Sequence, residues 1–287
     1  MYFKHEENTF MKKHLLHSFF AGLVCAGTMT SVYAQDMNNS NDSLKTSVEL
    51  SQGYRRDSLK TKVTRDHFSS KKHYKSIDTW TTRVDCMVEK DDMFMKALVG
   101  YGDVYDGKLH DHSNGGHHSH HKVKGDYTAD FALNFGKRFS WDNGWSVSPT
   151  VGYGVYVQDF HTKHHKKDRQ KAVWYSPQFG VCVNKSFNDT LNAYFDYTLL
   201  YPLNYQGTVH HKHQNKHHKD QENKAYKSAG NIFAIGLDWT FATNWSLKPE
   251  IEVMEFFSNG GDSQHRYRLK SADRSSIEYR LVLGYTF

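Results

Sequence analysis

The sequence predicts an all-β protein, a single antiparallel transmembrane β-barrel of about ten strands with short periplasmic turns and long outer loops. Three observations support this prediction. From about Ser47, runs of about 9–15 residues alternate apolar and polar side chains, which is enough to span a bilayer with the period of a strand. The connections between these runs are alternately tight and long. The chain ends on such a run, from Ile277 to Phe287.

Ten segments fit the pattern in order along the chain. They are residues 46–55, 75–88, 93–106, 125–140, 145–160, 171–187, 191–207, 225–242, 245–258 and 277–287. Short links rich in Asp, Asn and Gly join neighbours, because these residues tolerate turn conformations; the links are 89–92, 142–144, 188–190 and 243–244. Long polar loops are expected at 56–74, 107–124, 161–170, 208–224 and 259–276. An even strand number places both termini on the short-turn side, which is the periplasm.

The alternation gives each strand two faces. In segment 145–160, Val151 and Tyr153 share one face, and Thr150 and Gly152 share the other. The expected lumen positions carry both signs of charge: Glu49, Arg83, Asp85, Lys96, Asp130, Arg138, Asp196, Asp238, Lys248, Glu250, Glu252, Glu278 and Arg280. Because ten strands lie near the size that side chains fill, these charges must pair, and we expect a salt-bridged core instead of a wide pore. A soluble sandwich, the competing fold, would not explain why all long loops share one end.

The N-terminal region reads as an export signal. Residues 1–34 are predicted to be a signal peptide, with the true start at Met11, a basic beginning, an apolar stretch and a cleavage site before Gln35. A short extension, residues 35–45, then precedes the barrel at 46–287. The sequence therefore predicts a protein of the bacterial outer membrane, with its long loops facing the extracellular side and its wall in contact with membrane lipid.

Composition is compatible with this location. No apolar stretch approaches the roughly 20 residues that a spanning helix needs, but a barrel places its apolar side chains on every second residue. Aromatic residues make up 15% of the chain. Trp80, Trp145, Trp174, Trp239 and Trp245 lie near predicted strand ends, where they suit interfacial aromatic girdles, with ordinary core positions as the alternative. The basic residues of an exported chain do not indicate nucleic acid as a partner.

Fourteen of the 20 histidines fall in three neighbouring outer loops. They are His110, His112, His117, His118, His120 and His121, then His161, His164 and His165, then His210, His211, His213, His217 and His218. Neutral imidazole is a common metal ligand, so these tracts predict shallow sites that bind Zn, Cu or Ni loosely, while no cofactor is required. Alternatively they are solvated basic loops, in which interleaved lysines contact the phosphates of lipopolysaccharide.

A family resemblance follows from the layout and two local motifs. The ten-strand order and the ending Gly284-Tyr285-Thr286-Phe287 resemble the omptin family of outer-membrane proteases. The stretch from Gly100 to Asp111 resembles the omptin segment that rises along the third strand to the active-site rim. It is still more similar to outer-membrane proteins of chlamydia-like bacteria, a porin-like group. The resemblance covers the predicted barrel in topology, and it implies a surface-exposed rim.

The omptin resemblance implies a specific catalytic arrangement. Omptins carry an acidic pair on the second outer loop and an Asp-His pair on the fourth, which together activate a water molecule. Here Asp111 is followed by His112, so the second acid is missing, and the fourth loop has no acid before Asp220. The best residual pair is Asp111 with His211 or His213.

The functional prediction is therefore a surface protein with a porin-like or structural role and His-rich loops that bind divalent metal or lipopolysaccharide. The alternative is a diverged omptin-like endopeptidase acting at the extracellular rim. Adhesion through the outer loops is a third reading. The sequence indicates no oligomeric state.

Overall fold

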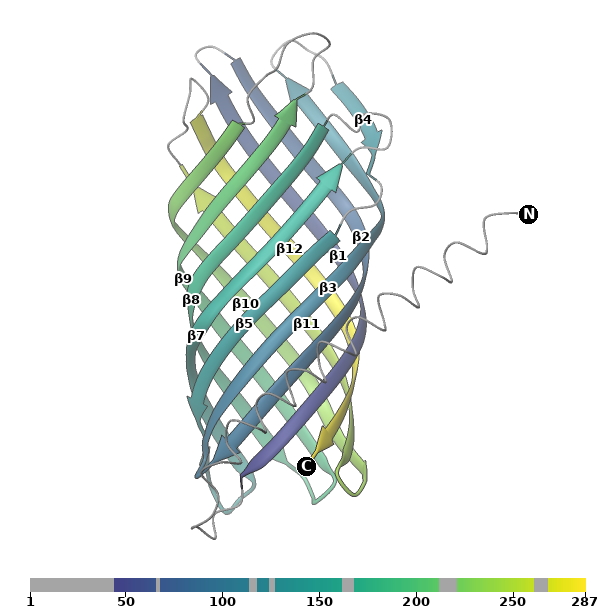
Figure 1. The fold of residues 1–287 in the computed structure, drawn as a ribbon, viewed down its shortest axis with the longest axis vertical. Coiled ribbons are helices and arrows are strands. Elements are labelled where there is room, and N and C mark those ends of the chain that lie inside the picture. Colours follow the sequence, from purple (N-terminus) through teal and green to yellow (C-terminus); the bar gives the residue numbers. More distant parts are fainter. Residues whose placement is uncertain are drawn as a thin grey trace, which may run out of the picture.

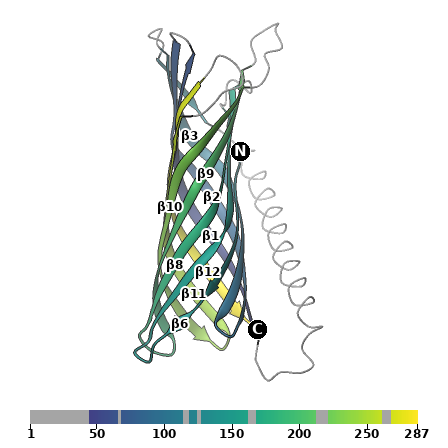
Figure 2. The same cartoon turned by 90° about the vertical axis from the view of Figure 1, so that its left-hand side faces the viewer.

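The computed structural model describes residues 44–65, 68–113, 118–123, 127–161, 168–211, 221–260 and 268–287. These residues form one tall antiparallel barrel of inclined strands (Figures 1 and 2). Within them, no helix reaches the length and apolar character that a membrane-spanning helix requires. The predicted signal peptide and most of the short extension lie outside the described residues.

The wall contains ten strands, as predicted. In sheet order they are β2, β1, β12, β11, β10, β9, β8, β7, β5 and β3, and pairing of β2 with β3 closes the ring. Two short strands are additional: β4 pairs with β3, and β6 pairs with β7. The bounds are β1 Lys45–Arg65, β2 Phe68–Lys90, β3 Met93–Ser113, β4 His118–Lys122, β5 Tyr127–Lys137, β6 Phe139–Ser140, β7 Trp145–His161, β8 Asp168–Ser186, β9 Leu191–His211, β10 Gln221–Ala242, β11 Trp245–Asn259 and β12 Arg268–Thr286.

The short turns gather at one end of the barrel, next to the C-terminus (Figure 1). Asp91, Asp92 and Asn244 have positive φ, as does Gly144. A Cβ on Gly144 would lie 2.8 Å from the carbonyl oxygen of Ser186, so the turn requires glycine there. At the fourth link, Asn188 Oδ1 accepts hydrogen bonds from the N–H groups of Thr190 and Leu191, so all four predicted short links are confirmed.

The strands extend further toward the opposite end than the sequence pattern predicts. Most of the predicted loop 56–74 is strand, because β1 continues to Arg65 and β2 begins at Phe68. Part of the predicted loop 107–124 likewise forms the hairpin of β3 and β4. These extensions pair along most of their length, with register shifts such as the one between Asp57 and Leu59 of β1, but outside the bilayer their outward side chains are polar. The apolar alternation that identifies a spanning strand is therefore missing from them.

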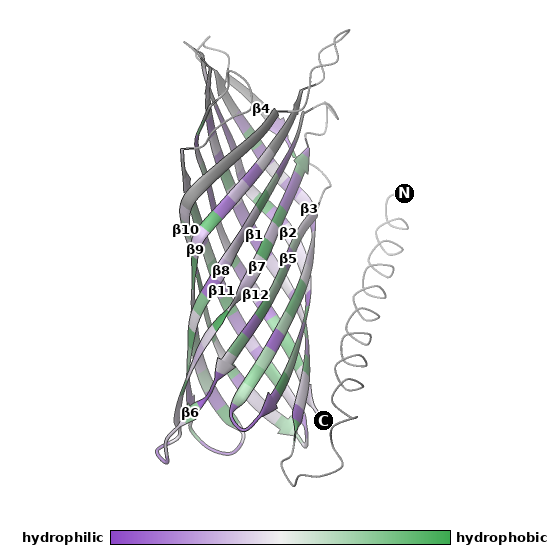
Figure 3. Cartoon of the chain, turned by 60° about the vertical axis from the view of Figure 1, so that its left-hand side comes forward, coloured by the Kyte–Doolittle hydropathy of each residue, from purple (hydrophilic) through white to green (hydrophobic). Residues whose placement is uncertain are grey.

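In the half of the barrel next to the short turns, the outer face is apolar. Val151 and Leu281 are 52% and 53% exposed on the wall, whereas Ser148 of the same strand as Val151 is buried inside. Figure 3 shows hydrophobic and hydrophilic residues alternating along the strands. This half meets the requirement for contact with lipid hydrocarbon.

In the other half of the barrel the outer face is polar and the inner face is apolar. On β1, Arg56, Lys60 and Lys62 are exposed on the outer face, and Leu59 between them is fully buried inside. Charged side chains are too costly to face hydrocarbon, so this part of the wall lies beyond the bilayer. A row of aromatic rings precedes the change: Tyr54, Trp80 and Tyr105 are neighbours on β1, β2 and β3, with ring centroids 6.0 and 6.2 Å apart.

The half of the barrel away from the short turns, here called the upper half, has an apolar core inside the barrel. Its largest members are six aromatic residues: Trp174, Tyr74, Phe160, Phe256, Tyr156 and Tyr205. Trp174 is fully buried there, so its predicted place in an aromatic girdle is wrong. The other four tryptophans of that prediction are between 40% and 59% exposed on the outer wall, as a girdle requires. Trp174 differs because it lies on the inward face of β8.

Candidate functional site

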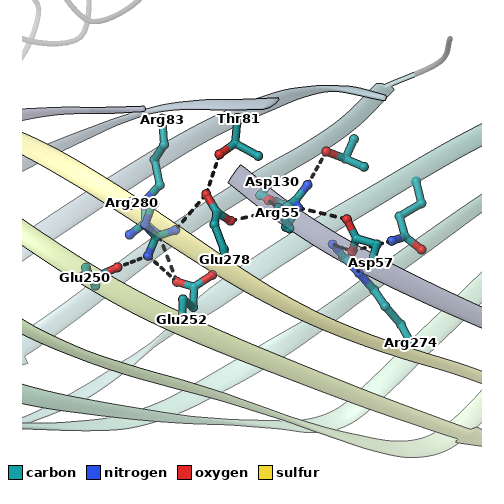
Figure 4. Close-up of polar contacts among 12 residues, drawn as sticks. Arg55, Asp57, Thr81, Arg83, Asp130, Glu250, Glu252, Arg274, Glu278 and Arg280 are labelled. Carbon is teal, nitrogen blue, oxygen red and sulfur yellow. Dashed lines mark hydrogen bonds and ion pairs between the residues drawn. The ribbon is translucent and has the colours of Figure 1, made fainter. Parts of the chain in front are cut away.

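A network of ion pairs crosses the lumen, and Figure 4 shows its contacts. It adjoins the apolar core through Arg274. Arg55 is its centre and is only 1% exposed. Its guanidinium lies 3.1 Å from Asp57, 2.6 Å from Asp130 and 3.6 Å from Glu278. The partners come from β1, β5 and β12, so one side chain joins strands from different parts of the ring.

Arg280 forms the second centre of the network. It pairs with Glu250, lies 2.6 Å from Glu252 and 3.7 Å from Glu278. Glu252 also lies 3.2 Å from Arg83, which pairs with its neighbour Asp85 at 2.9 Å. Buried charges of both signs are therefore matched across the lumen, as the sequence predicts.

Arg274 connects the ion pairs to the apolar core. Its guanidinium donates to Asp57 at 3.1 Å and lies over the rings of Trp174 and Phe256, 5.7 and 5.3 Å from their centroids. Asp57 also accepts a hydrogen bond from Gln158 at 2.9 Å. Arg274 and Asp57 are both buried, and so are the aromatic rings above them.

The lumen is more accessible toward the short-turn end. There Lys248 lies 2.8 Å from Glu49 and 2.9 Å from Asp238, and these three side chains remain about one fifth exposed. Among the described residues, the lumen thus opens to solvent near the periplasm and is filled by side chains at the level of Arg55 and Arg274.

Sequence reasoning identified most of the charged lumen but missed Arg55, Asp57 and Arg274. Asp57 and Arg274 fall in segments that were predicted to be loops. A signal was present: Glu49 faces inward, and the period of two carries the inward face to Arg55 and Asp57. The inward face of β1 changes from charged to apolar between Asp57 and Leu59, and this change hid the continuity of the strand.

The predicted histidine ligands are only partly described. The side chains of His110, His121 and His161 are described, and the backbone of His112, His118, His120, His210 and His211 is placed in strands. His117, His164, His165, His213, His217 and His218 lie outside the described residues. No group of three potential ligands gathers among the side chains that are described. Binding of Zn, Cu or Ni by the tracts stays a prediction.

One histidine pair on the outer wall was not predicted. His73 of β2 lies directly opposite His110 of β3, and their ring centroids are 6.4 Å apart. The Oγ atom of Ser58 lies 3.1 Å from Nε2 of His73. Partial burial lowers the pKa of His73 to about 4, and the positive charges of Lys60 and other neighbours act in the same direction. The imidazole is therefore neutral at neutral pH.

The residual catalytic candidates lie on separate strands. Asp111 belongs to β3 and His211 to β9, with β5, β7 and β8 between them in the ring. The side chains of both residues, and all of His213, lie outside the described part of the chain. Their catalytic pairing stays a prediction.

Comparisons with known proteins identify the fold and the family. The sequence profile of a family described as "Pom: Protochlamydia outer membrane protein" matches residues 49–280. Among solved structures, the outer membrane protease OmpT from Escherichia coli is similar with a TM-score of 0.67 and 11% identity, covering 87% of this chain and 99% of that protein.

Two other barrels are more distant. The translocator domain of the autotransporter NalP from Neisseria meningitidis has a TM-score of 0.37 and 11% identity, covering 94% of this chain and 98% of that one. The attachment invasion locus protein Ail of Yersinia pestis has a TM-score of 0.32 and 12% identity, covering 84% of this chain and 98% of that one. No curated protein matches the chain. At these identities the likeness to OmpT shows the barrel fold alone.

Proposed function

The chain belongs to the family of Protochlamydia outer membrane proteins, and on this premise we propose that it is a surface barrel with a structural role and no open pore. The outer-membrane location and the barrel follow from the family and the fold. One observation carries the structural role: below an apolar core, the buried Arg55 and Asp57 of β1 reach across the lumen to Asp130 of β5 and Gln158 of β7.

Opening this lumen would be costly. A permeating solute would have to separate Arg55 of β1 from Asp130 of β5, and breaking a buried ion pair costs about 3–5 kcal/mol. It would also have to displace Trp174 and Phe256, which are fully buried. Ten strands leave little room for a channel beside these side chains. A wide porin-like path is therefore the less favoured of the two roles.

Planar-bilayer recording tests this proposal. The mature barrel should give small conductance steps or none, in bilayers where a general porin gives large ones. Its folded state is verified by the gel mobility shift between unheated and heated samples. Large, stable open steps from the folded barrel would overturn the proposal and establish a porin.

The outer loops add a second part to the proposal: binding of divalent transition metal and of lipopolysaccharide. Support comes from the His-rich composition and from the interleaved lysines, which suit imidazole coordination and phosphate contact respectively. Calorimetry with Zn²⁺ should give binding heat that disappears when the three histidine tracts are deleted. Equal heat from the deleted protein would refute metal binding by the loops.

The alternative, a diverged endopeptidase, has a separate test. We expect no cleavage when the folded barrel is incubated with peptides that contain paired basic residues, because the second acid of the omptin pair is missing. Cleavage that Asp111→Ala abolishes would instead establish the protease reading.

A further inference from the structure

We propose that a divalent transition metal binds on the outer wall of the barrel, between His73 of β2 and His110 of β3. This inference deepens the proposed metal binding by the histidine tracts, but it assigns a site on paired strands and includes a histidine outside every tract. The two residues are directly opposite in the β2–β3 ladder. The site lies on the extended part of the wall, beyond the aromatic row of Tyr54, Trp80 and Tyr105.

The separation of the rings suits a shared ion. A metal about 2 Å from a ring nitrogen lies roughly 3 Å from the ring centre, so two rings that share it are about 5–6 Å apart. The observed 6.4 Å between the centroids of His73 and His110 is close to that range. A small side-chain rotation closes the difference. The strand pairing holds both backbones in place, so chelation orders only the two side chains.

A second group orients His73. In the tautomer in which Nε2–H donates to Ser58 Oγ, 3.1 Å away, Nδ1 carries the lone pair that a metal requires. Histidine ligands in metal sites commonly donate their other ring N–H to such a partner, which fixes the tautomer and the ring.

The surrounding charges limit the affinity. Lys60 lies directly opposite His73 on β1, and Lys71 and Lys75 are on the same strand as His73. All three are exposed, so their charges are screened by water and salt. They favour the competing ligand, a phosphate anion, which the experiment must distinguish. Of the common divalent metals, Cu²⁺ should bind more tightly than Zn²⁺ or Ni²⁺.

Histidine footprinting on the full mature barrel tests the site residue by residue. Diethyl pyrocarbonate modifies unprotonated, accessible imidazoles, and mass spectrometry locates each modified histidine. Zn²⁺ should slow modification of His73 and His110 together. In the variant His110→Ala the protection of His73 should disappear. The control is His121→Ala, because His121 pairs with Leu109, whose side chain is buried inside the barrel, and so lies on the other face.

The outcomes distinguish metal binding at this site from metal binding by the loops. Ser58→Ala should raise the Zn²⁺ concentration for half-protection by about 10-fold, since it removes the orienting partner and no ligand. Unchanged labelling of His73 in Zn²⁺, or protection that survives His110→Ala, would overturn the inference. Protection of His73 by inorganic phosphate and not by Zn²⁺ would also overturn it. Protection of His161 in the same spectra reports metal binding by the loops independently.

Discussion

Arg274 holds a positive charge where solvent does not reach. Burial of an arginine is tolerable only if its charge and its N–H donors are matched. Asp57 provides the opposite charge at 3.1 Å, and the rings of Trp174 and Phe256 provide aromatic faces for the guanidinium. The planar guanidinium can make both kinds of contact at once, which a lysine ammonium cannot do in the same way.

Replacement of Arg274 should destabilise the barrel strongly. Arg274→Ala leaves part of the Asp57 charge unmatched and a cavity beside Trp174, so the free energy of unfolding should fall by about 3–5 kcal/mol. The matched control is Arg56→Ala on the outer wall. Arg56 is 54% exposed and pairs with Asp78, and an exposed pair of this kind contributes little to stability because water screens it. Urea unfolding in detergent, followed by tryptophan fluorescence, measures both; similar losses would contradict the assignment of Arg274 to a buried network.

At the scale of the element, β1 carries two opposite patterns in one continuous strand. Near its beginning, Leu50 faces outward and Glu49 faces the lumen, whereas further along Lys60 faces outward and Leu59 is buried inside. The strand has 21 residues, about twice the 9–11 that cross a bilayer. The first pattern suits lipid outside and ion pairs inside, and the second suits water outside and an apolar core inside.

Two adjacent substitutions on β1 test this change of pattern. Leu59→Lys places an unpaired charge in the apolar core and should prevent stable folding or cost several kcal/mol. Lys60→Leu alters only the water-exposed face and should change the free energy of unfolding by less than about 0.5 kcal/mol. The same urea titration compares them. A larger effect from Lys60→Leu than from Leu59→Lys would mean that the inward and outward faces are assigned in reverse.

The sequence was sufficient to predict the structure of the part of the barrel that lies in lipid. Alternation identified the ten wall strands, and Asp91, Asp92, Asn244 and Gly144 marked the turns, because lipid and tight turns each demand particular residue types. The charged lumen followed from the same alternation. Pairing of these charges was predictable because a buried charge without a partner is too costly.

The sequence was insufficient to predict the strands and contacts of the part beyond the bilayer. There water replaces lipid, so outward positions such as Lys60 and Lys62 are polar, and their strand resembles a loop. His73 was missed for the same reason: its partner His110 is distant in sequence, and only strand pairing brings the two together. Trp174 was misplaced because a position near a strand end suggests a girdle, whereas the even-numbered positions of β8 from Ala172 to Gln178 all face inward.

At the scale of the whole molecule, the barrel joins a lipid-facing section to a section that projects beyond the membrane. The ion-pair network around Arg55 lies at the junction, directly below the apolar core. The outer face of each section suits the medium around it, which is lipid for one and water for the other. Strand pairing runs through both sections. The height of the bilayer on the wall is therefore the property that decides which residues meet lipid and which meet water.

Depth-dependent fluorescence quenching tests that height. Tryptophan is introduced by Leu50→Trp or by Lys60→Trp in a background whose own tryptophans are replaced by Phe. The two outward positions are separated by roughly 33 Å along β1, which is about 25 Å in height at a typical strand tilt. Brominated lipid should quench the fluorophore of Leu50→Trp strongly and that of Lys60→Trp hardly at all. Strong quenching in both would place the charged upper wall in lipid and refute the projecting section, together with the water-exposed metal site on it.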